Sequence, residues 1–117
     1  MSEDQGRIGA ANDRVLCAAS SYDEKYYFNK RFSKIPEDIK KELNVICVLF
    51  TEDVGGIIQF VYDEEGNLMI ETSAAESDFL YDDIGAGMLV NEIRKKRKDM
   101  LQKLELYYKV MFLGAEL

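Results

Sequence analysis

Charge is distributed very unevenly along this chain of 117 residues, which has a net charge of −7. The segment from Glu42 to Glu92 contains twelve acidic residues and no lysine or arginine, and the basic residues lie on either side of it. Like charges repel one another unless counter-charge lies close by. We therefore expect the acidic middle either to face the basic ends within the fold or to face a basic partner.

The length and composition of the chain are those of one globular domain. Apolar residues make up 47% of the sequence and charged residues 32%, which indicates a chain with a core. Residues 1–13 show no periodicity and are expected to form a tail, and residues 14–117 a single compact domain. The longest apolar run has six residues, whereas a membrane span needs about twenty. The pI of about 4.6 argues against general affinity for nucleic acid or an anionic membrane.

The sequence contains no histidine and two cysteines. Without histidine, Ser-His-Asp and Cys-His catalysis cannot occur within one copy or between identical copies, and zinc sites that use histidine are excluded. Cys17 and Cys47 both have apolar neighbours, so we expect reduced, buried thiols. The first thirteen residues show no apolar signal segment, and we expect a cytoplasmic protein with no catalytic role and no cofactor.

The first half of the chain is predicted to form two helices. Apolar and aromatic residues recur at helical spacing over residues 14–28, although the aromatic run at 26–28 is also typical of a strand. A second helix is predicted from the first turn at Pro36, which two acidic residues follow, to the stop at Gly55. Its segment 45–50 is apolar on every side, which indicates a helix buried all round or, alternatively, a strand.

A β-hairpin is the next predicted element. Residues 57–62 and 68–72 are rich in β-branched and aromatic side chains, and the turn between them begins with Asp63 and contains Gly66. Both faces of this hairpin carry apolar residues, so helices should cover it. A capping-box pattern then predicts a short helical turn within residues 73–81.

A long C-terminal helix is predicted over residues 88–113. Apolar residues recur there at alternating spacings of four and three, in a heptad stripe that is interrupted by Arg97. The predicted fold class is therefore α+β, with two N-terminal helices, a β-hairpin and a long C-terminal amphipathic helix in a single compact domain.

Two clusters of acidic residues are candidates for metal binding. The turn at residues 63–67 lacks the glycine and glutamate positions of an EF-hand loop, so we expect a solvated turn. Asp78, Asp82 and Asp83 are weak candidates for Mg²⁺ or another hard cation, since two of them would share one face of a helix. The simpler interpretation is that these acids lie near a helix N-terminus and interact with its dipole.

A dense basic cluster runs from Arg94 to Lys98. Arg94, Arg97 and Lys98 would share one side of a helix and can contact phosphate groups or an acidic protein surface. The simpler interpretation is counter-charge for the acidic hairpin, in the same chain or across a dimer. Tyr107 and Tyr108 follow on the same helix, and tyrosine rings suit half-buried positions and interfaces. These five residues are our candidates for partner binding.

Several short strings occur together in this chain. They are Lys25-Tyr26-Tyr27-Phe28-Asn29, Thr51-Glu52-Asp53-Val54-Gly55-Gly56, Asp78-Phe79-Leu80-Tyr81-Asp82, Leu106-Tyr107-Tyr108 and Phe112-Leu113-Gly114. Over about residues 14–114, the chain resembles a family of small acidic proteins of unknown function from anaerobic gut Firmicutes. The resemblance implies a bacterial cytoplasmic protein and implies no activity, ligand or site residue.

These observations favour a non-catalytic protein-interaction module, a homodimer that acts as an adaptor or chaperone-like factor. The heptad stripe, the two-faced hairpin and the tyrosines favour self-association, and an unknown protein partner is the second expectation. One alternative is binding of nucleic acid or another anion through the basic residues 94–98. A further alternative is a small metal-dependent enzyme that uses Asp78, Asp82 and Asp83.

Overall fold

A computed structural model of the protein describes residues 13–116. The tail predicted at residues 1–13 therefore lies outside the described residues, except for its last one. The elements, in chain order, are β1 (Val15–Ser20), β2 (Lys25–Phe28), the short 3-10 helix η1 (Lys30–Phe32), α1 (Glu37–Val54), β3 (Ile57–Tyr62), β4 (Leu68–Ser73), α2 (Asp83–Lys96) and α3 (Lys98–Phe112).

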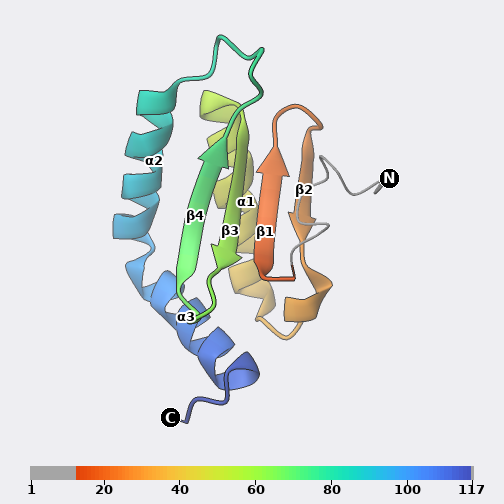
Figure 1. The fold of residues 1–117 in the computed structure, drawn as a ribbon, viewed down its shortest axis with the longest axis vertical. Coiled ribbons are helices and arrows are strands. Elements are labelled where there is room, and N and C mark those ends of the chain that lie inside the picture. Colours follow the sequence, from red (N-terminus) through yellow and green to blue (C-terminus); the bar gives the residue numbers. More distant parts are fainter. Residues whose placement is uncertain (1–12, 117) are drawn as a thin grey trace.

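The strands form one antiparallel sheet in the order β2-β1-β3-β4. Helix α1 packs against β1, β2 and β3 on one face of the sheet, and α2 lies beside α1 (Figure 1). Helix α3 continues from α2 and passes the end of the sheet where the β3–β4 turn lies. The α+β class is confirmed, but the predicted order of elements is wrong, because strands and not helices come first.

The prediction of a helix over residues 14–28 is wrong, because this segment forms the hairpin of β1 and β2. All six residues of β1 are buried; β1 is an inner strand of the sheet, and α1 packs against one of its faces. Its register with β3 shifts between Val15 and Cys17, and this bulge places Leu16 and Cys17 together in the core under the helices. A bulge breaks the alternation of inward and outward side chains along a strand. The spacing of the apolar residues in this segment then matches a helix equally well. The alternative of a strand at 26–28 is confirmed.

The second predicted helix is confirmed as α1, and the segment 45–50 is helical throughout. Pro36 precedes the first turn with φ −56°, a value that its ring sets in advance, and Gly55 ends the helix with a positive φ of 81°. The buried residues of α1 form the stripe that faces the sheet. They are Leu43, Ile46, Cys47 and Phe50.

The predicted hairpin is confirmed as β3 and β4, and β4 extends one residue further, to Ser73. The carboxylate of Asp63 holds the turn, because its Oδ1 accepts hydrogen bonds from the backbone N–H groups of Asn67 (2.9 Å) and Glu65 (2.8 Å). These bonds favour the charged form and keep the pKa of Asp63 below its usual value. Gly66 has a φ of 87°, which residues with a Cβ rarely adopt.

Two predictions for the C-terminal third are wrong. The long helix at 88–113 is divided at Arg97 into α2 and α3, and α2 begins earlier, at Asp83. Arg97 departs from helical geometry with φ −111° and ψ 25°, and the chain changes direction there, so that α3 packs below the sheet (Figure 1). The capping-box segment at 73–76 opens no helix, because residues 74–82 form a loop between β4 and α2.

Two buried cysteines join β1 to α1. Cys17 and Cys47 are free thiols with their Sγ atoms 3.9 Å apart, in agreement with the predicted buried, reduced state. The neighbouring Cys17 thiol and burial hold the pKa of Cys47 far above its usual value. The hydroxyl of Tyr26 is also buried beside Cys17, without a hydrogen bond of normal geometry. Thiolate chemistry is therefore disfavoured at Cys47.

An aromatic cluster attaches α3 to the sheet. The rings of Phe32, Tyr62, Tyr108 and Phe112 contact one another, and Tyr62 on β3 stacks on Tyr108 of α3 with centroids 4.2 Å apart. The Tyr62 hydroxyl donates a buried hydrogen bond of 2.8 Å to the backbone carbonyl of Leu104 on α3. Stacking and hydrogen bonding therefore fix both the distance and the rotation of α3 relative to the sheet.

Replacing Tyr62 with phenylalanine should keep the ring stack and remove the hydrogen bond to Leu104. We expect the free energy of unfolding to fall by about 1–2 kcal/mol, measured by urea titration with circular dichroism. Tyr27→Phe is the matched control, because Tyr27 lies on the face of the sheet away from the helices, and it should change stability by less than about 0.5 kcal/mol. A Tyr62→Phe variant as stable as the wild type would contradict this role of the hydroxyl.

Candidate interaction surfaces

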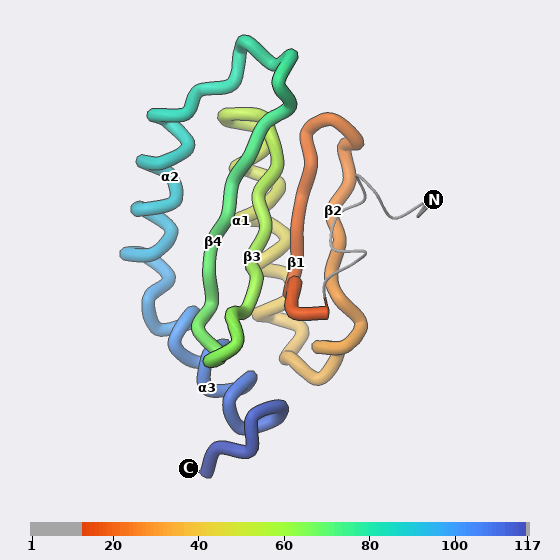
Figure 2. Tube along the Cα trace, in the orientation of Figure 1, coloured from red at the N-terminus to blue at the C-terminus, as the bar shows by residue number. Residues whose placement is uncertain are grey.

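Acidic side chains gather at one end of the molecule. The β1–β2 turn, the C-terminus of α1, the loop after β4 and the start of α2 all lie there (Figure 2). Segments 21–24, 52–56 and 74–83 contain eight carboxylates and no lysine or arginine. We call this group the acidic end, and its members are Asp23, Glu24, Glu52, Asp53, Glu76, Asp78, Asp82 and Asp83. The charge segregation along the sequence therefore becomes a separation of charge in space.

Basic residues concentrate toward the opposite end. Segments 30–41 and 94–98 contain five lysine or arginine residues each. The acidic turn at 63–65 also lies there, next to α3, where Lys109 packs close to Gly66. We expected the acidic middle of the chain to face its basic ends. The turn at 63–65 does so, but the acidic end of the molecule lies away from both basic segments.

A shallow groove runs between α1 and α2. It consists of two adjoining hollows of about 220 and 310 Å³ that share Asp53, Leu89 and Glu92. Apolar side chains in both hollows remain open to solvent, with Leu49 of α1 58% exposed and Met88 of α2 67% exposed, and the carboxylates Asp53 and Glu92 lie where the hollows join. We call this feature the α1–α2 groove.

The two ends of the α1–α2 groove carry opposite charges. Asp82 lines it at the acidic end, Lys96 and Arg97 line it at the other, and Asp53 lies between them; Lys96 also forms an ion pair of 3.7 Å with Glu92. Arg97 also forms an ion pair of 2.6 Å with Glu42, which links the two helices there. A surface with exposed apolar residues and with opposite charges at its two ends is complementary to a second copy of itself in the reverse orientation.

The structure separates the five residues predicted to bind a partner. Arg97 lines the α1–α2 groove, Arg94 donates a hydrogen bond of 3.4 Å to a backbone carbonyl of β4, and Lys98 is exposed at the start of α3. Tyr107 is half-buried. Tyr108 is only 4% exposed and belongs to the aromatic cluster of the core.

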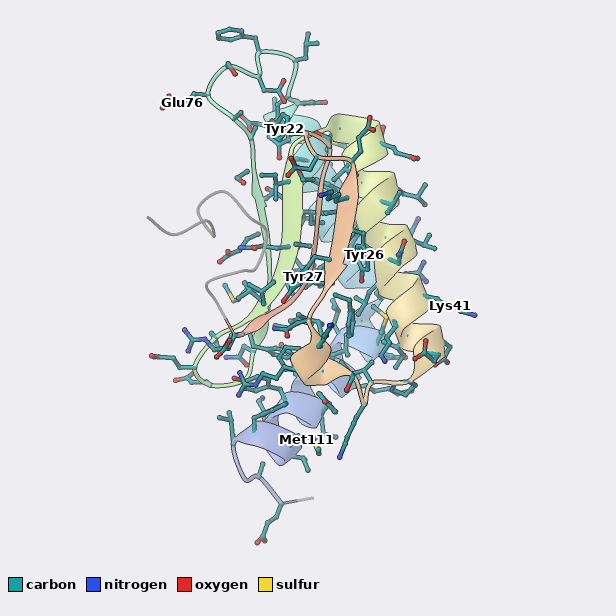
Figure 3. The ribbon with its side chains drawn as sticks, turned by 90° about the vertical axis from the view of Figure 1, so that its right-hand side faces the viewer. Tyr22, Tyr26, Tyr27, Lys41, Glu76 and Met111 are labelled. Atoms are coloured by element: carbon teal, nitrogen blue, oxygen red, sulfur yellow. The ribbon has the colours of Figure 1, made fainter. Side chains whose placement is uncertain are left out.

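The loop at 74–82 is tied to the β1–β2 turn by Tyr22. The Tyr22 hydroxyl donates a hydrogen bond of 2.6 Å to Oδ2 of Asp78 and accepts one of 2.9 Å from the backbone N–H of Ala75. The hydrogen bond to the Asp78 carboxylate raises the pKa of the Tyr22 phenol above its usual value. Figure 3 shows Tyr22 at the same end of the molecule as Glu76 of this loop.

The three aspartates considered as weak metal ligands have other contacts. Asp78 binds Tyr22, and Asp82 accepts a hydrogen bond of 2.8 Å from the backbone N–H of Gly85, which makes it the N-cap of α2. Asp83 lies in the first turn of α2, where its charge meets the positive end of the helix dipole. Within residues 13–116, no three carboxylates or thiols lie close enough together to hold a metal ion.

Sequence reasoning missed the exposed apolar residues of the α1–α2 surface. The apolar segment at 45–50 was expected to be buried all round, but Val45 is 52% exposed and Leu49 is 58% exposed. The loop before α2 also exposes Phe79 and Leu80 almost completely. A helix that is apolar on every side but packs on a sheet with one side leaves its other apolar residues at the surface, and this pattern is the signal in the sequence that could have located them.

The sequence model of one family matches residues 13–116, which is nearly the whole chain. The chain belongs to DUF6145, a family of unknown function. Comparison with curated proteins and with solved structures gave no match. The predicted resemblance is thereby confirmed as far as a family of unknown function. In the described part of this DUF6145 chain, no helix combines the length and the apolar character that crossing a bilayer requires.

Replacing Tyr22 with phenylalanine should release the 74–82 loop of this DUF6145 protein, because both hydrogen bonds of the hydroxyl are lost. We expect faster amide hydrogen exchange at Ala75, measured by NMR. The free energy of unfolding should fall by less than about 1 kcal/mol, because these bonds are exposed. Tyr27→Phe is again the control, and unchanged exchange at Ala75 in Tyr22→Phe would show that other contacts hold the loop.

Proposed function

We propose that this DUF6145 protein is a non-catalytic protein-interaction module that works as a homodimer, as an adaptor or chaperone-like factor in the bacterial cytoplasm. The α1–α2 groove is the dimer surface. The observation that carries the proposal is the set of exposed apolar residues along this groove, which has opposite charges at its two ends.

Exposed apolar side chains occur on both helices that form the groove. Large apolar residues that are exposed together on neighbouring elements often mark an interaction site. Four large apolar residues on the outer sides of α1 and α2 are each more than half exposed. They are Val45, Leu49, Ile84 and Met88.

The direction of the helices supports a two-fold dimer. Helices α1 and α2 run antiparallel, so the C-terminus of α1 and the N-terminus of α2 share the acidic end (Figure 1). A second copy related by a two-fold axis across the α1–α2 groove would place its basic end against the acidic end of the first. Asp53 of one copy would then lie near Lys96 of the other, and the exposed apolar residues of the two copies would cover each other.

Two further observations support this reading of function. Arg94 and Arg97 are engaged within the chain, which favours a structural use of the basic cluster over nucleic-acid binding. Cys17 and Cys47 are free thiols within 3.9 Å of each other, a state that a reducing compartment such as the cytoplasm maintains.

Replacing Leu49 with glutamate should disrupt the dimer, because the new charge would be buried among the apolar residues of the interface. We expect the dimer dissociation constant, measured by sedimentation equilibrium, to rise by about 100-fold. The control is Met69→Glu, which makes a similar change at an exposed residue of β4, outside the groove, and should leave the constant unchanged. A wild-type protein that stays monomeric at high micromolar concentration would refute the dimer.

Exchanging charges tests the two-fold arrangement separately. Asp53→Lys and Lys96→Glu should each weaken the dimer by about threefold to tenfold, as expected for exposed ion pairs. The double variant should recover most of the loss, because its ends are again complementary. Additive weakening in the double variant would show that the two residues do not face each other across the interface.

A further inference from the structure

Strand β2 is an edge of the sheet with outward-facing backbone groups. In an antiparallel pair, every second residue directs its N–H and C=O toward the partner strand. The N–H of Asn29 donates a hydrogen bond of 3.0 Å to the carbonyl of Leu16. By the register of the two strands, the backbone groups of Tyr27 and Lys25 are directed toward β1 in the same way. The backbone groups of Tyr26 and Phe28 therefore point away from β1. Such an edge is a template for another strand.

A second groove lies beside this edge, on the flank of α1 that faces away from α2. It has a volume of about 470 Å³, which is within the range of binding sites, and it lies between β2 and α1. The Tyr26 side chain lies between β2 and α1, whereas Tyr27 lies on the other side of the strand (Figure 3). Ala19 and Val48 complete the apolar part of the lining. We call this feature the β2–α1 groove.

The charges around the β2–α1 groove select its occupant. Glu24 and Glu52 line it, with Lys25 as the one basic residue among its lining residues. Both glutamates belong to the acidic end, together with Asp23, which is next to Glu24 in the sequence. A segment with lysine or arginine side chains would meet complementary charge there, and an acidic segment would be repelled.

We propose that the β2 edge and the β2–α1 groove bind an extended, basic segment of a partner protein, which adds to the sheet as a fifth strand. Backbone hydrogen bonds with Tyr26 and Phe28 hold the segment, and every second side chain of the segment enters the groove over the Tyr26 ring. The α1–α2 groove lies on the opposite flank of α1. Evidence against the dimer would therefore not count against this proposal, and the reverse also holds.

A designed peptide tests the proposal directly. The probe is a fluorescein-labelled octapeptide with two lysines at each end and alternating valine and threonine between them, so that either strand direction brings lysines to the acidic end. We expect saturable binding by fluorescence anisotropy, weakened by added salt. The same peptide with glutamates in place of the lysines should not bind. No saturable binding of the lysine peptide at low salt would overturn the proposal.

Amide exchange distinguishes strand addition from other modes of binding. In the free protein, the amides of Tyr26 and Phe28 should exchange quickly and that of Tyr27 slowly, because only the latter is directed at β1. Saturating lysine peptide should slow exchange at Tyr26 and Phe28 and leave Tyr27 unchanged. Binding without this alternate protection would overturn the proposal. Protection of the two amides in the free protein that grows with its concentration would assign the edge to a second copy and would also overturn it.

Side-chain variants locate the site. The double variant Glu24→Gln with Glu52→Gln should bind the lysine peptide about threefold to tenfold more weakly, because two exposed charge interactions are lost. The matched control is Glu64→Gln with Glu65→Gln in the β3–β4 turn, which removes the same charge at the opposite end and should bind like the wild type. Equal weakening by both pairs would show general charge attraction and would overturn the assignment to this groove.

Discussion

The burial of β1 between two neighbouring strands is the constraint on which the rest of the structure depends. Each of its six residues is buried, and its Cys17 packs against Cys47 in α1. A two-stranded hairpin is marginally stable in water, so neither β1–β2 nor β3–β4 would persist alone. Pairing β1 with β3 unites the two hairpins into one sheet, which α1 can cover along its length.

The antiparallel arrangement also decides where the charges lie. Because neighbouring elements reverse direction, turns that are distant in the sequence meet at the same end of the molecule (Figure 2). The β1–β2 turn, the end of α1 and the loop before α2 each carry carboxylates, and together they form the acidic end. Helix α1 runs from the basic toward the acidic part of the molecule. The grooves on its two flanks therefore both include carboxylates of the acidic end, and the α1–α2 groove has Lys96 and Arg97 at its other end.

The elements with strong local signals were predictable from the sequence. Pro36 and Gly55 mark the ends of α1, and the turn with Asp63 and Gly66 marks the β3–β4 hairpin. The predictions failed where tertiary contacts overrode the local pattern. The bulge in β1 hid its alternation. The apolar repeat resumes after Arg97 and so predicted one helix, whereas the chain turns at Arg97 and α3 packs on Tyr62 and its aromatic neighbours. The candidate surfaces were less predictable, since each joins residues from elements that are neighbours only in the folded chain.

The amino-acid sequence by itself determined the α+β class, the buried thiols, the absence of histidine chemistry and the segregation of charge, because these follow from residue type and from spacing over a few turns. Only the tertiary structure decided which helices lie side by side, which strand became an edge and which apolar residues stayed at the surface. Those outcomes depend on pairing between residues far apart in the chain. Tyr108 shows the difference, because its ring suits an interface or a core equally well, and packing against Tyr62 placed it in the core.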